Sequence, residues 1–495
     1  MTTSLRKNSI MMVLYEVLTL IVPLVLTPYV SRTIGASGIG IYSYSFSVVS
    51  YFVIIVQLGV KLYGRREIAK VNDDITKYSV VFWEIFSIQT VMFILASLFY
   101  VFFLFEFYEK SLLKLALCIQ FIEIVVGYLD ISWLFYGIEK FKVVLLRNVI
   151  VRLLEVAFVF LFVTDQTRQI QYILIMALSN LLGVIMMWIT LKGNLIRVKL
   201  CMKSIIARFL PLLTLFIPVL STQLFSIVDK TIIGAYLSLD NVGEYENAYK
   251  IAKIPVVIIA ALGSVMLPRV TKLLADSRDN EAKMYISKSM SIVMFISFGL
   301  AFEMAALASI FIPWFLGKGF ENAISLFQIL SFMIVFIGWG NVLRTQYMLP
   351  RGFDKLYTKS VIYGSLTNII LSFLFVKTLG VVGVAFASLL GEAIICVYSS
   401  IKMKDELRFC TLIKESSIYL YSSVVMFFVV MFSVKWMLDI TESLFLILIS
   451  AGILGMFSYL ACTCFFERMT NRHIIEDELN IIIANIKNIL KNEKI

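Results

Sequence analysis

The chain of 495 residues has a net charge of +11, and its composition is 60% hydrophobic but only 16% charged, with a mean hydropathy of +0.91. Soluble domains mix the two classes more evenly, so a water-soluble protein is excluded. The six cysteines form no C-x-x-C pair, and His473 is the single histidine. Sites built from several histidines are therefore excluded, and we expect no metal ion or other cofactor.

Apolar stretches of at least eighteen residues recur along the whole chain. Each of them can cross a bilayer core of about 30 Å as a helix. They predict an all-α integral membrane protein with about fourteen transmembrane helices. In chain order, the expected spans cover residues 10–32, 40–60, 79–105, 112–136, 143–163, 169–191, 209–236, 243–268, 286–312, 322–348, 358–376, 379–401, 415–434 and 442–466.

The basic residues indicate how the spans are oriented. Alternate loops hold most of the lysines and arginines, and by the positive-inside rule these loops and both termini face the cytoplasm. The net positive charge largely reflects this bias and requires no nucleic-acid partner. The loops predicted to be cytoplasmic include Lys61, Arg65, Arg66, Lys70, Lys77, Lys140, Lys142, Arg197 and Lys199, whereas the opposite loops hold only Lys110, Arg168, Lys318, Lys377 and Lys435.

The last residues of the chain have a different pattern. After residue 466, apolar residues recur at steps of three and four, with Glu, Asn and Lys between them. This spacing predicts an amphipathic helix on the inner membrane surface or against the helix bundle. Its apolar face would consist of Ile475, Leu479, Ile482, Ile486 and Ile489.

An internal repeat divides the expected spans into two halves. The pattern Gly40-Ile-Tyr42 returns as Gly243-Glu-Tyr245, and other glycine, proline and arginine positions follow in the same order. Repeats in parallel orientation are typical of transporters, with a substrate cavity between the halves. We therefore expect an N-lobe with spans 1–6 (residues 1–195), a C-lobe with spans 7–12 (196–405), spans 13–14 (406–466) and a cytoplasmic tail (467–495).

Several basic residues fall within the expected spans, where a charge is costly unless it faces a cavity. Four of them lie toward the outer half of the membrane, against the positive-inside trend: Arg32, Lys230, Lys250 and Lys253. They predict a cationic cavity that binds phosphate. Arg152 could instead be neutralised by Glu155 three residues later, and Arg344 could snorkel to the headgroups. The candidate substrate-binding residues are Arg32, Arg152, Lys230, Lys250, Lys253 and Arg344.

Buried carboxyl groups could couple transport to an ion, because in an apolar environment they can exchange a proton near neutral pH. None of them has metal-site spacing. The candidates for ion coupling are Glu16, Glu123, Asp130, Glu155, Asp229 and Glu392.

Three segments of the first 150 residues resemble one family. They are the run from Pro28 to Tyr42 with Arg32 and Gly35, the run from Leu58 to Ala69, and Trp133-Leu-Phe-Tyr-Gly-Ile-Glu-Lys140. Together they resemble the Wzx-type polysaccharide repeat-unit flippases of the multidrug/oligosaccharidyl-lipid/polysaccharide exporter superfamily. One departure is Tyr136, where members of that family often have Gln.

The resemblance implies two six-helix lobes with two additional C-terminal helices, as in the MATE transporters. It also implies a non-enzymatic flippase of a bacterial inner membrane, which moves undecaprenyl-diphosphate-linked oligosaccharide to the outer leaflet by alternating access, for capsule or O-antigen assembly. Arg32 is then expected to touch the diphosphate. The expected partners are this lipid-linked sugar, membrane lipids, and a polysaccharide polymerase with other assembly proteins; a monomer is expected.

Three other functions are compatible with many apolar spans. A cation-coupled drug exporter of the same fold would favour an acidic cavity. A flippase for lipid-linked peptidoglycan precursor would also have a cationic cavity. A membrane polysaccharide polymerase would need a sizeable outward-facing loop for catalysis, and the sequence offers none.

The predicted orientation has a direct test. A cysteine introduced directly after Lys110 should react with a membrane-impermeant maleimide added to intact spheroplasts, because this loop is predicted to face outward. A cysteine introduced after Lys140 should react only after permeabilisation. Labelling with the opposite pattern would overturn the orientation.

Overall fold

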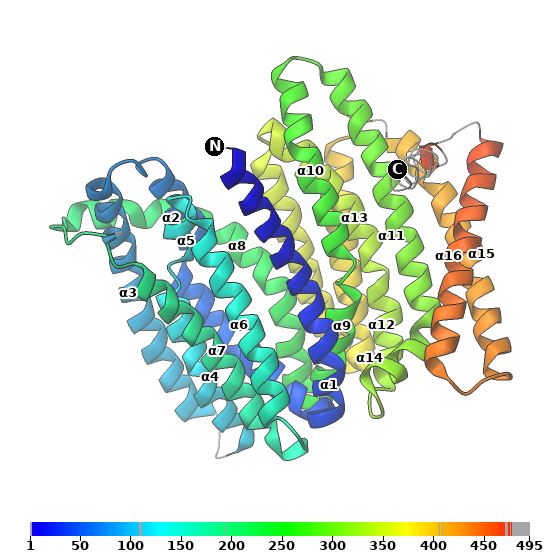
Figure 1. Ribbon diagram of the computed structural model, residues 1–495, viewed down its shortest axis with the longest axis horizontal. Coiled ribbons are helices and arrows are strands. Elements are labelled where there is room, and N and C mark those ends of the chain that lie inside the picture. Colours follow the sequence, from blue (N-terminus) through cyan, green and yellow to red (C-terminus); the bar gives the residue numbers. More distant parts are fainter. Residues whose placement is uncertain are drawn as a thin grey trace, which may run out of the picture. The chain divides into compact units, whose positions relative to one another are not determined.

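The computed structural model describes the backbone of residues 2–107, 111–193, 195–404, 406–407, 409–470, 474–475 and 477. Side chains are described from Ile21 onward, apart from those of residues 107, 218 and 410. Every regular element in these residues is a helix (Figure 1). The predicted all-α class is therefore confirmed.

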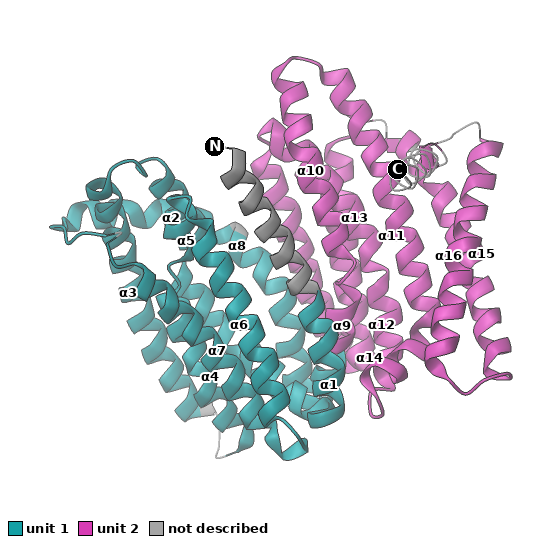
Figure 2. Ribbon diagram, in the orientation of Figure 1, with its two compact units in different colours: residues 1–246 teal, residues 247–495 magenta. Residues whose placement is uncertain are grey.

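The chain forms two compact units, residues 1–246 and 247–495 (Figure 2). The predicted lobe boundary after residue 195 stays a prediction. The first unit contains α1 (Thr2–Gln57), α2 (Val60–Ala69), α3 (Ile75–Phe107), α4 (Leu112–Leu129), α5 (Ser132–Gly137), α6 (Phe141–Phe162), a short 3-10 helix (Gln166–Arg168), α7 (Gln169–Thr190), α8 (Met202–Tyr236) and the first part of α9 (Leu239–Ala252).

The second unit continues from α9. Its helices are α10 (Val256–Ala275), α11 (Asp279–Leu316), α12 (Asn322–Ser331), α13 (Met333–Asn341), a π-helix (Val342–Met348), a 3-10 turn (Leu349–Arg351), α14 (Asp354–Lys402), α15 (Phe409–Leu438) and α16 (Leu444–Met469).

Ten helical stretches among the described residues are long and apolar enough to cross a membrane, or eleven if the bent α8 is counted as one span. All fourteen predicted segments fall on helical backbone, but the number fourteen stays a prediction. Two long helices each contain two predicted spans, which meet at a glycine: α1 at Gly35 (φ 69°) and α14 at Gly380 (φ 62°). Glycine adopts this left-handed region without steric cost, so a single residue reverses the chain.

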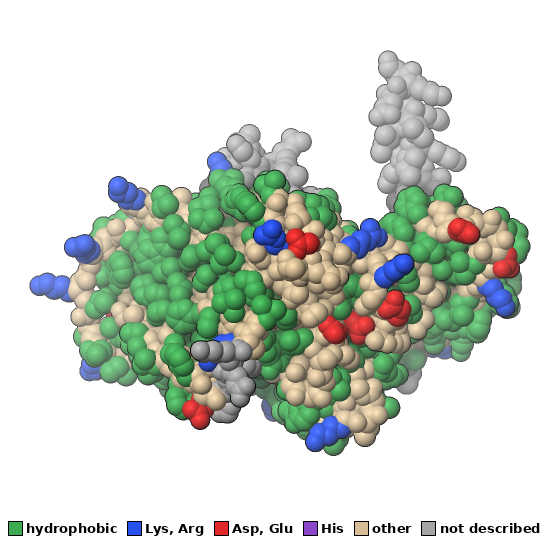
Figure 3. All heavy atoms as spheres, turned by 90° about the horizontal axis from the view of Figure 1, so that it is seen from below, with side chains coloured by type: hydrophobic (Ala, Val, Ile, Leu, Met, Phe, Trp, Pro, Cys, Tyr) green, Lys and Arg blue, Asp and Glu red, His purple; other side chains and the backbone are tan. Residues whose placement is uncertain are grey.

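Large apolar side chains point outward along these helices. Phe105 is 77% exposed, Phe432 is 73% exposed and Leu98 is 66% exposed. On the face seen from below in Figure 3, hydrophobic side chains are interspersed with basic and acidic ones. Outward-facing apolar side chains of this kind are unfavourable in water and favourable against lipid, in agreement with a multi-span membrane protein.

The corresponding glycines of the two sequence repeats meet within the first unit. A Cβ atom on Gly40 would lie 1.7 Å from the carbonyl oxygen of Leu239, and one on Gly243 would lie 2.0 Å from that of Ala36. The backbones of α1 and α9 are therefore in direct contact. Small residues permit such close crossings, which are a main source of helix association in membranes.

The other two segments that carried the family resemblance pack against each other. Helix α2 lies on α5, where a Cβ atom on Gly64 would come within 2.4 Å of the Trp133 ring, and one on Gly137 within 2.5 Å of Ile68. Trp133 and Ile68 belong to one buried apolar cluster. The two segments that resemble the family therefore form one packing unit in the structure.

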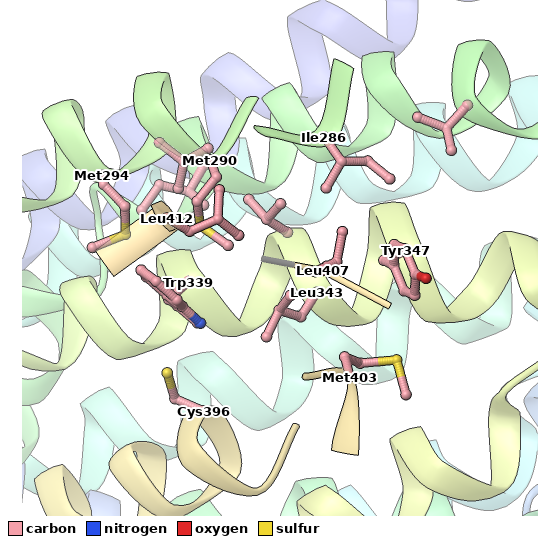
Figure 4. Close-up of a cluster of buried hydrophobic side chains, with 14 of the residues drawn as sticks. Ile286, Met290, Met294, Trp339, Leu343, Tyr347, Cys396, Met403, Leu407 and Leu412 are labelled. Atoms are coloured by element: carbon pink, nitrogen blue, oxygen red, sulfur yellow. The ribbon is translucent and has the colours of Figure 1, made fainter. Parts of the chain in front are cut away.

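The second unit has its own apolar core. Met290 and Met294 from α11, Trp339 from α13, Leu343 from the π-helix and Cys396 from α14 lie together in it (Figure 4). Next to this core, α11, α15 and α16 pack against one another. These contacts join the last two predicted spans to the rest of the second unit.

The predicted tail begins against this core. The buried carboxylate of Glu467 accepts a hydrogen bond from the Ile475 amide (3.1 Å), and Ile475 is itself buried. Packing against the bundle is thus observed at the first apolar position of the tail. Its other predicted apolar positions, Leu479, Ile482, Ile486 and Ile489, lie outside the described residues.

The glycine contact between α1 and α9 predicts a large effect of one methyl group. Gly40→Ala should lower the unfolding free energy by about 1–3 kcal/mol or more, because the backbone of Leu239 cannot yield as a side chain can. The matched control is Gly452→Ala, whose Cβ would lie 3.6 Å from the nearest atom, an ordinary contact distance. Equal melting temperatures of the two variants in detergent would contradict the prediction.

Candidate functional site

The predicted site residues of the first unit come from four helices, and two of the pairs that they form are buried. On α6, Arg152 Nη1 lies 2.6 Å from Glu155 Oε2. The Glu155 side chain is fully buried, whereas that of Arg152 is 42% exposed. This distance supports the alternative that the two residues neutralise each other. The ion pair reduces the positive charge that Arg152 can offer to a ligand.

Asp229 and Lys230 on α8 both have partners from α9. Lys230 Nζ lies 3.1 Å from Glu246 Oε2, and Asp229 accepts a hydrogen bond of 2.7 Å from the Tyr245 hydroxyl. Asp229 is fully buried, and both side chains of the Lys230–Glu246 pair are nearly so. These contacts join α8 to α9 and satisfy two charges that would be costly alone in an apolar interior.

Two tyrosines link these pairs to a third carboxylate. The rings of Tyr42 (α1) and Tyr172 (α7) pack edge to face at 5.1 Å. The carboxyl groups of Glu123 (α4), Glu155 and Glu246 lie in the neighbourhood of Tyr42, and the last two also lie near Tyr172.

We call this group the polar cluster. It consists of Tyr42, Glu123, Arg152, Glu155, Tyr172, Lys230 and Glu246, which come from six helices of the first unit. Its cations are both paired with carboxylates, and Glu123 adds a further carboxyl group, which accepts a hydrogen bond of 2.9 Å from Asn180. Arg147 on α6 also lies near Glu123 and Glu155, so cations and carboxylates are present in similar number around the cluster.

Sequence reasoning missed several residues of this neighbourhood. Tyr172 and Asn180 were not among the expected site residues, although they are polar residues within the expected sixth span. Tyr42 and Glu246 were not among them either. The contacts that select these residues are between helices, and spacing along one helix does not reveal them.

The remaining candidates of the first unit lie elsewhere. Arg32 is exposed on α1, one turn before the left-handed Gly35. Asp130 lies at the break between α4 and α5, where it accepts a hydrogen bond from the Ser132 amide (3.0 Å) and pairs with Lys61 at 3.0 Å. These contacts give Asp130 a local structural role. The side chain of Glu16 lies outside the described residues.

The second unit holds the other candidates. Lys250 is half-buried on α9, and Lys253, in the turn directly after α9, donates a hydrogen bond of 2.5 Å to the Tyr249 hydroxyl. Arg344 lies in the π-helix, where its Nε donates to the Gly340 carbonyl (3.1 Å) and its guanidinium lies 5.6 Å from the Tyr357 ring centre. Glu392 is buried on α14. A cavity shared by the two units stays a prediction.

An apolar cavity that the sequence did not predict lies in the second unit. Its volume is about 500 Å³, and it lies between α11, α13, α14 and α15. Its walls include Met294, Phe298, Trp339, Cys396 and Leu420. Such walls suit a hydrocarbon chain better than a polar ligand.

Comparison with known proteins gives both a family and a fold. Residues 5–274 match the family described as "Polysaccharide biosynthesis protein". A protein of Escherichia coli named "Putative O-antigen transporter" is 26% identical over 398 residues, which cover 79% of this chain and 95% of that protein.

Two solved structures have a similar fold. The inward closed conformation of the lipid II flippase MurJ aligns with a TM-score of 0.73 and 18% identity, covering 94% of this chain and 99% of that one. An inward-facing multidrug resistance MATE family transporter of the MOP superfamily aligns with a TM-score of 0.60 and 14% identity, covering 77% of this chain and 94% of that one. The MATE-like fold predicted from the sequence is confirmed.

The ion pair on α6, in which Glu155 is buried and Arg152 is half-exposed, predicts non-additive effects. Arg152→Gln should lower the unfolding free energy by about 1–3 kcal/mol, because it leaves the Glu155 carboxylate buried without its cation. Adding Glu155→Gln should restore much of this loss. Thermal unfolding of the wild type, both single variants and the double variant completes a double-mutant cycle. Strictly additive losses of unfolding free energy would contradict a coupled pair.

Proposed function

The chain belongs to the polysaccharide biosynthesis protein family, and from this we propose that it is a flippase for lipid-linked oligosaccharide. It transfers undecaprenyl-diphosphate-linked repeat units from the cytoplasmic to the outer leaflet of a bacterial inner membrane by alternating access. Both termini lie in the cytoplasm. The chain supplies transport and no catalysis, and it works beside a polymerase that uses the transferred units.

One observation carries this proposal beyond family membership. A group of seven ionisable residues, the polar cluster, is held inside an all-helical bundle whose outer surface is apolar. Charged groups within a bilayer are costly, and where they occur they usually line a path for polar cargo. The apolar cavity in the second unit supports the same function, because a polyprenyl chain needs such a surface while its sugar head crosses.

Within this proposal, the basic residues bind the diphosphate. Arg32 is the first candidate because it is exposed and carries the family resemblance. The other candidates are Arg152, Lys230, Lys250, Lys253 and Arg344, of which Arg152 and Lys230 form ion pairs with Glu155 and Glu246. Glu123, Glu155 and Glu392 are the buried carboxyl groups best suited to ion coupling, since each lies within the predicted membrane interior.

A second candidate function is export of small cationic molecules by the same fold. The carboxylates of the polar cluster are compatible with it, because a site for cations needs negative charge, but the cluster also holds the cations Arg152 and Lys230. The O-antigen name of the Escherichia coli relative favours the first function. Deletion in the native host separates them: accumulation of lipid-linked sugar on the inner leaflet supports the flippase, whereas unchanged lipid-linked sugar with increased drug sensitivity supports the exporter.

The proposed diphosphate contact has a specific test. Arg32→Ala should reduce surface polysaccharide at least tenfold, which corresponds to about 1.4 kcal/mol, within the range of one charge-assisted hydrogen bond. Arg32→Lys should retain part of the activity, because it keeps the charge but not the guanidinium fork. Protein level and membrane insertion, measured by immunoblot, should not change. Normal export by the alanine variant would refute the contact.

A further inference from the structure

Helix α2 is a short amphipathic helix, and the proposed function assigns no role to its charged face. It buries Val60, Tyr63, Gly64 and Ile68 and exposes the residues between them. The close contact of Gly64 with Trp133 fixes the helix on α5. The exposed face consists of Lys61, Leu62, Arg65, Arg66, Ala69 and Lys70.

Most cations around α2 already have carboxylate partners. Lys61 pairs with Asp130 at 3.0 Å, and Lys70 pairs with Glu67 at 2.5 Å. On α8, Arg208 contacts the buried Glu84 at 2.5 Å and also approaches Glu67. These pairs involve Asp130, Glu67 and Glu84.

Arg65 and Arg66 are the exception. Both are exposed, and neither forms an ion pair with any carboxylate among the residues that the structure describes. Arg65 lies 5.4 Å from the ring centre of Tyr136 on α5, a cation–π contact that restricts its rotamers. The helix therefore presents the guanidinium groups of two consecutive residues, whose long side chains can converge on one ligand, and the ring contact restricts that of Arg65.

This pair matches one chemical group closely. A guanidinium binds phosphate oxygens in a bidentate manner, so two adjacent guanidinium groups can bind the two phosphates of a diphosphate. Leu62, one turn before Arg66, is 52% exposed and adds an apolar contact beside the cations. Cationic and apolar side chains on one helix face are typical of segments at the boundary of headgroups and acyl chains.

We propose that Arg65 and Arg66 form the first binding site for the diphosphate of the lipid-linked substrate, at the cytoplasmic leaflet. The site rests on the proposed function and on the predicted orientation of the loops, and it lies on a different helix from the substrate-binding candidates. The simpler alternative is that the two arginines only set topology and attract anionic phospholipid, roles that lysine fills as well.

The test uses the charge-conserving double variant R65K/R66K of the full chain, reconstituted in phosphatidylcholine nanodiscs. Binding of undecaprenyl diphosphate and of phosphatidylglycerol is measured by native mass spectrometry. The variant should bind undecaprenyl diphosphate about tenfold more weakly, because lysine lacks the bidentate fork, and should bind phosphatidylglycerol like the wild type. The control R197Q/K199Q removes two exposed basic side chains from another predicted cytoplasmic loop and should change neither affinity.

The outcomes separate this site from the proposed function. Unchanged binding of undecaprenyl diphosphate by R65K/R66K would overturn the arginine site and leave the flippase proposal standing. Equally weakened binding of both lipids would also overturn the arginine site, since the arginines would then bind anionic headgroups in general. No binding of undecaprenyl diphosphate by the wild type would overturn both proposals. Matching melting temperatures of all variants establish that a loss of affinity is not a loss of fold.

Discussion

The cost of removing a charge from water governs the interior of this protein. Charged side chains inside the first unit occur mainly as close pairs, such as Arg152 with Glu155 and Lys230 with Glu246. Each pair recovers part of the desolvation free energy only while its geometry holds. The helices that carry the partners are consequently fixed relative to each other: α8 is joined to α9 by charge, and α1 to α9 by the contact at Gly40 and Gly243.

The same cost explains the contrast between buried and exposed cations. In the interior, a cation without a carboxylate would be destabilising, so pairing there says little about ligand binding. At the surface of α2 no such penalty exists, because Arg65 and Arg66 are exposed. An unpaired cation in an interior and an unpaired cation on an amphipathic surface helix are therefore different kinds of evidence. The second is the better indication of an anionic ligand in this unit.

The sequence was sufficient for the fold class and the position of nearly every helix, because apolar length and glycine placement are local properties. It also identified Gly40 and Gly243 as equivalent positions. It could not show that these two glycines lie in contact, since contact between helices depends on residues that are far apart in the chain. The candidate site was predicted less well for the same reason. The partner of Lys230 is Glu246, sixteen residues away on another helix, and Tyr172 joins the cluster through a ring contact with Tyr42.

The single-residue reversals at Gly35 and Gly380 have a consequence for how the protein meets its surroundings. Two pairs of predicted spans are joined without a loop, so only short exposed stretches, such as residues 377–379 before Gly380, are present at these points. Proteases need several accessible and flexible residues to engage a polypeptide. On the side of the membrane predicted to face outward, these two joints therefore offer a protease much less chain than a flexible loop would.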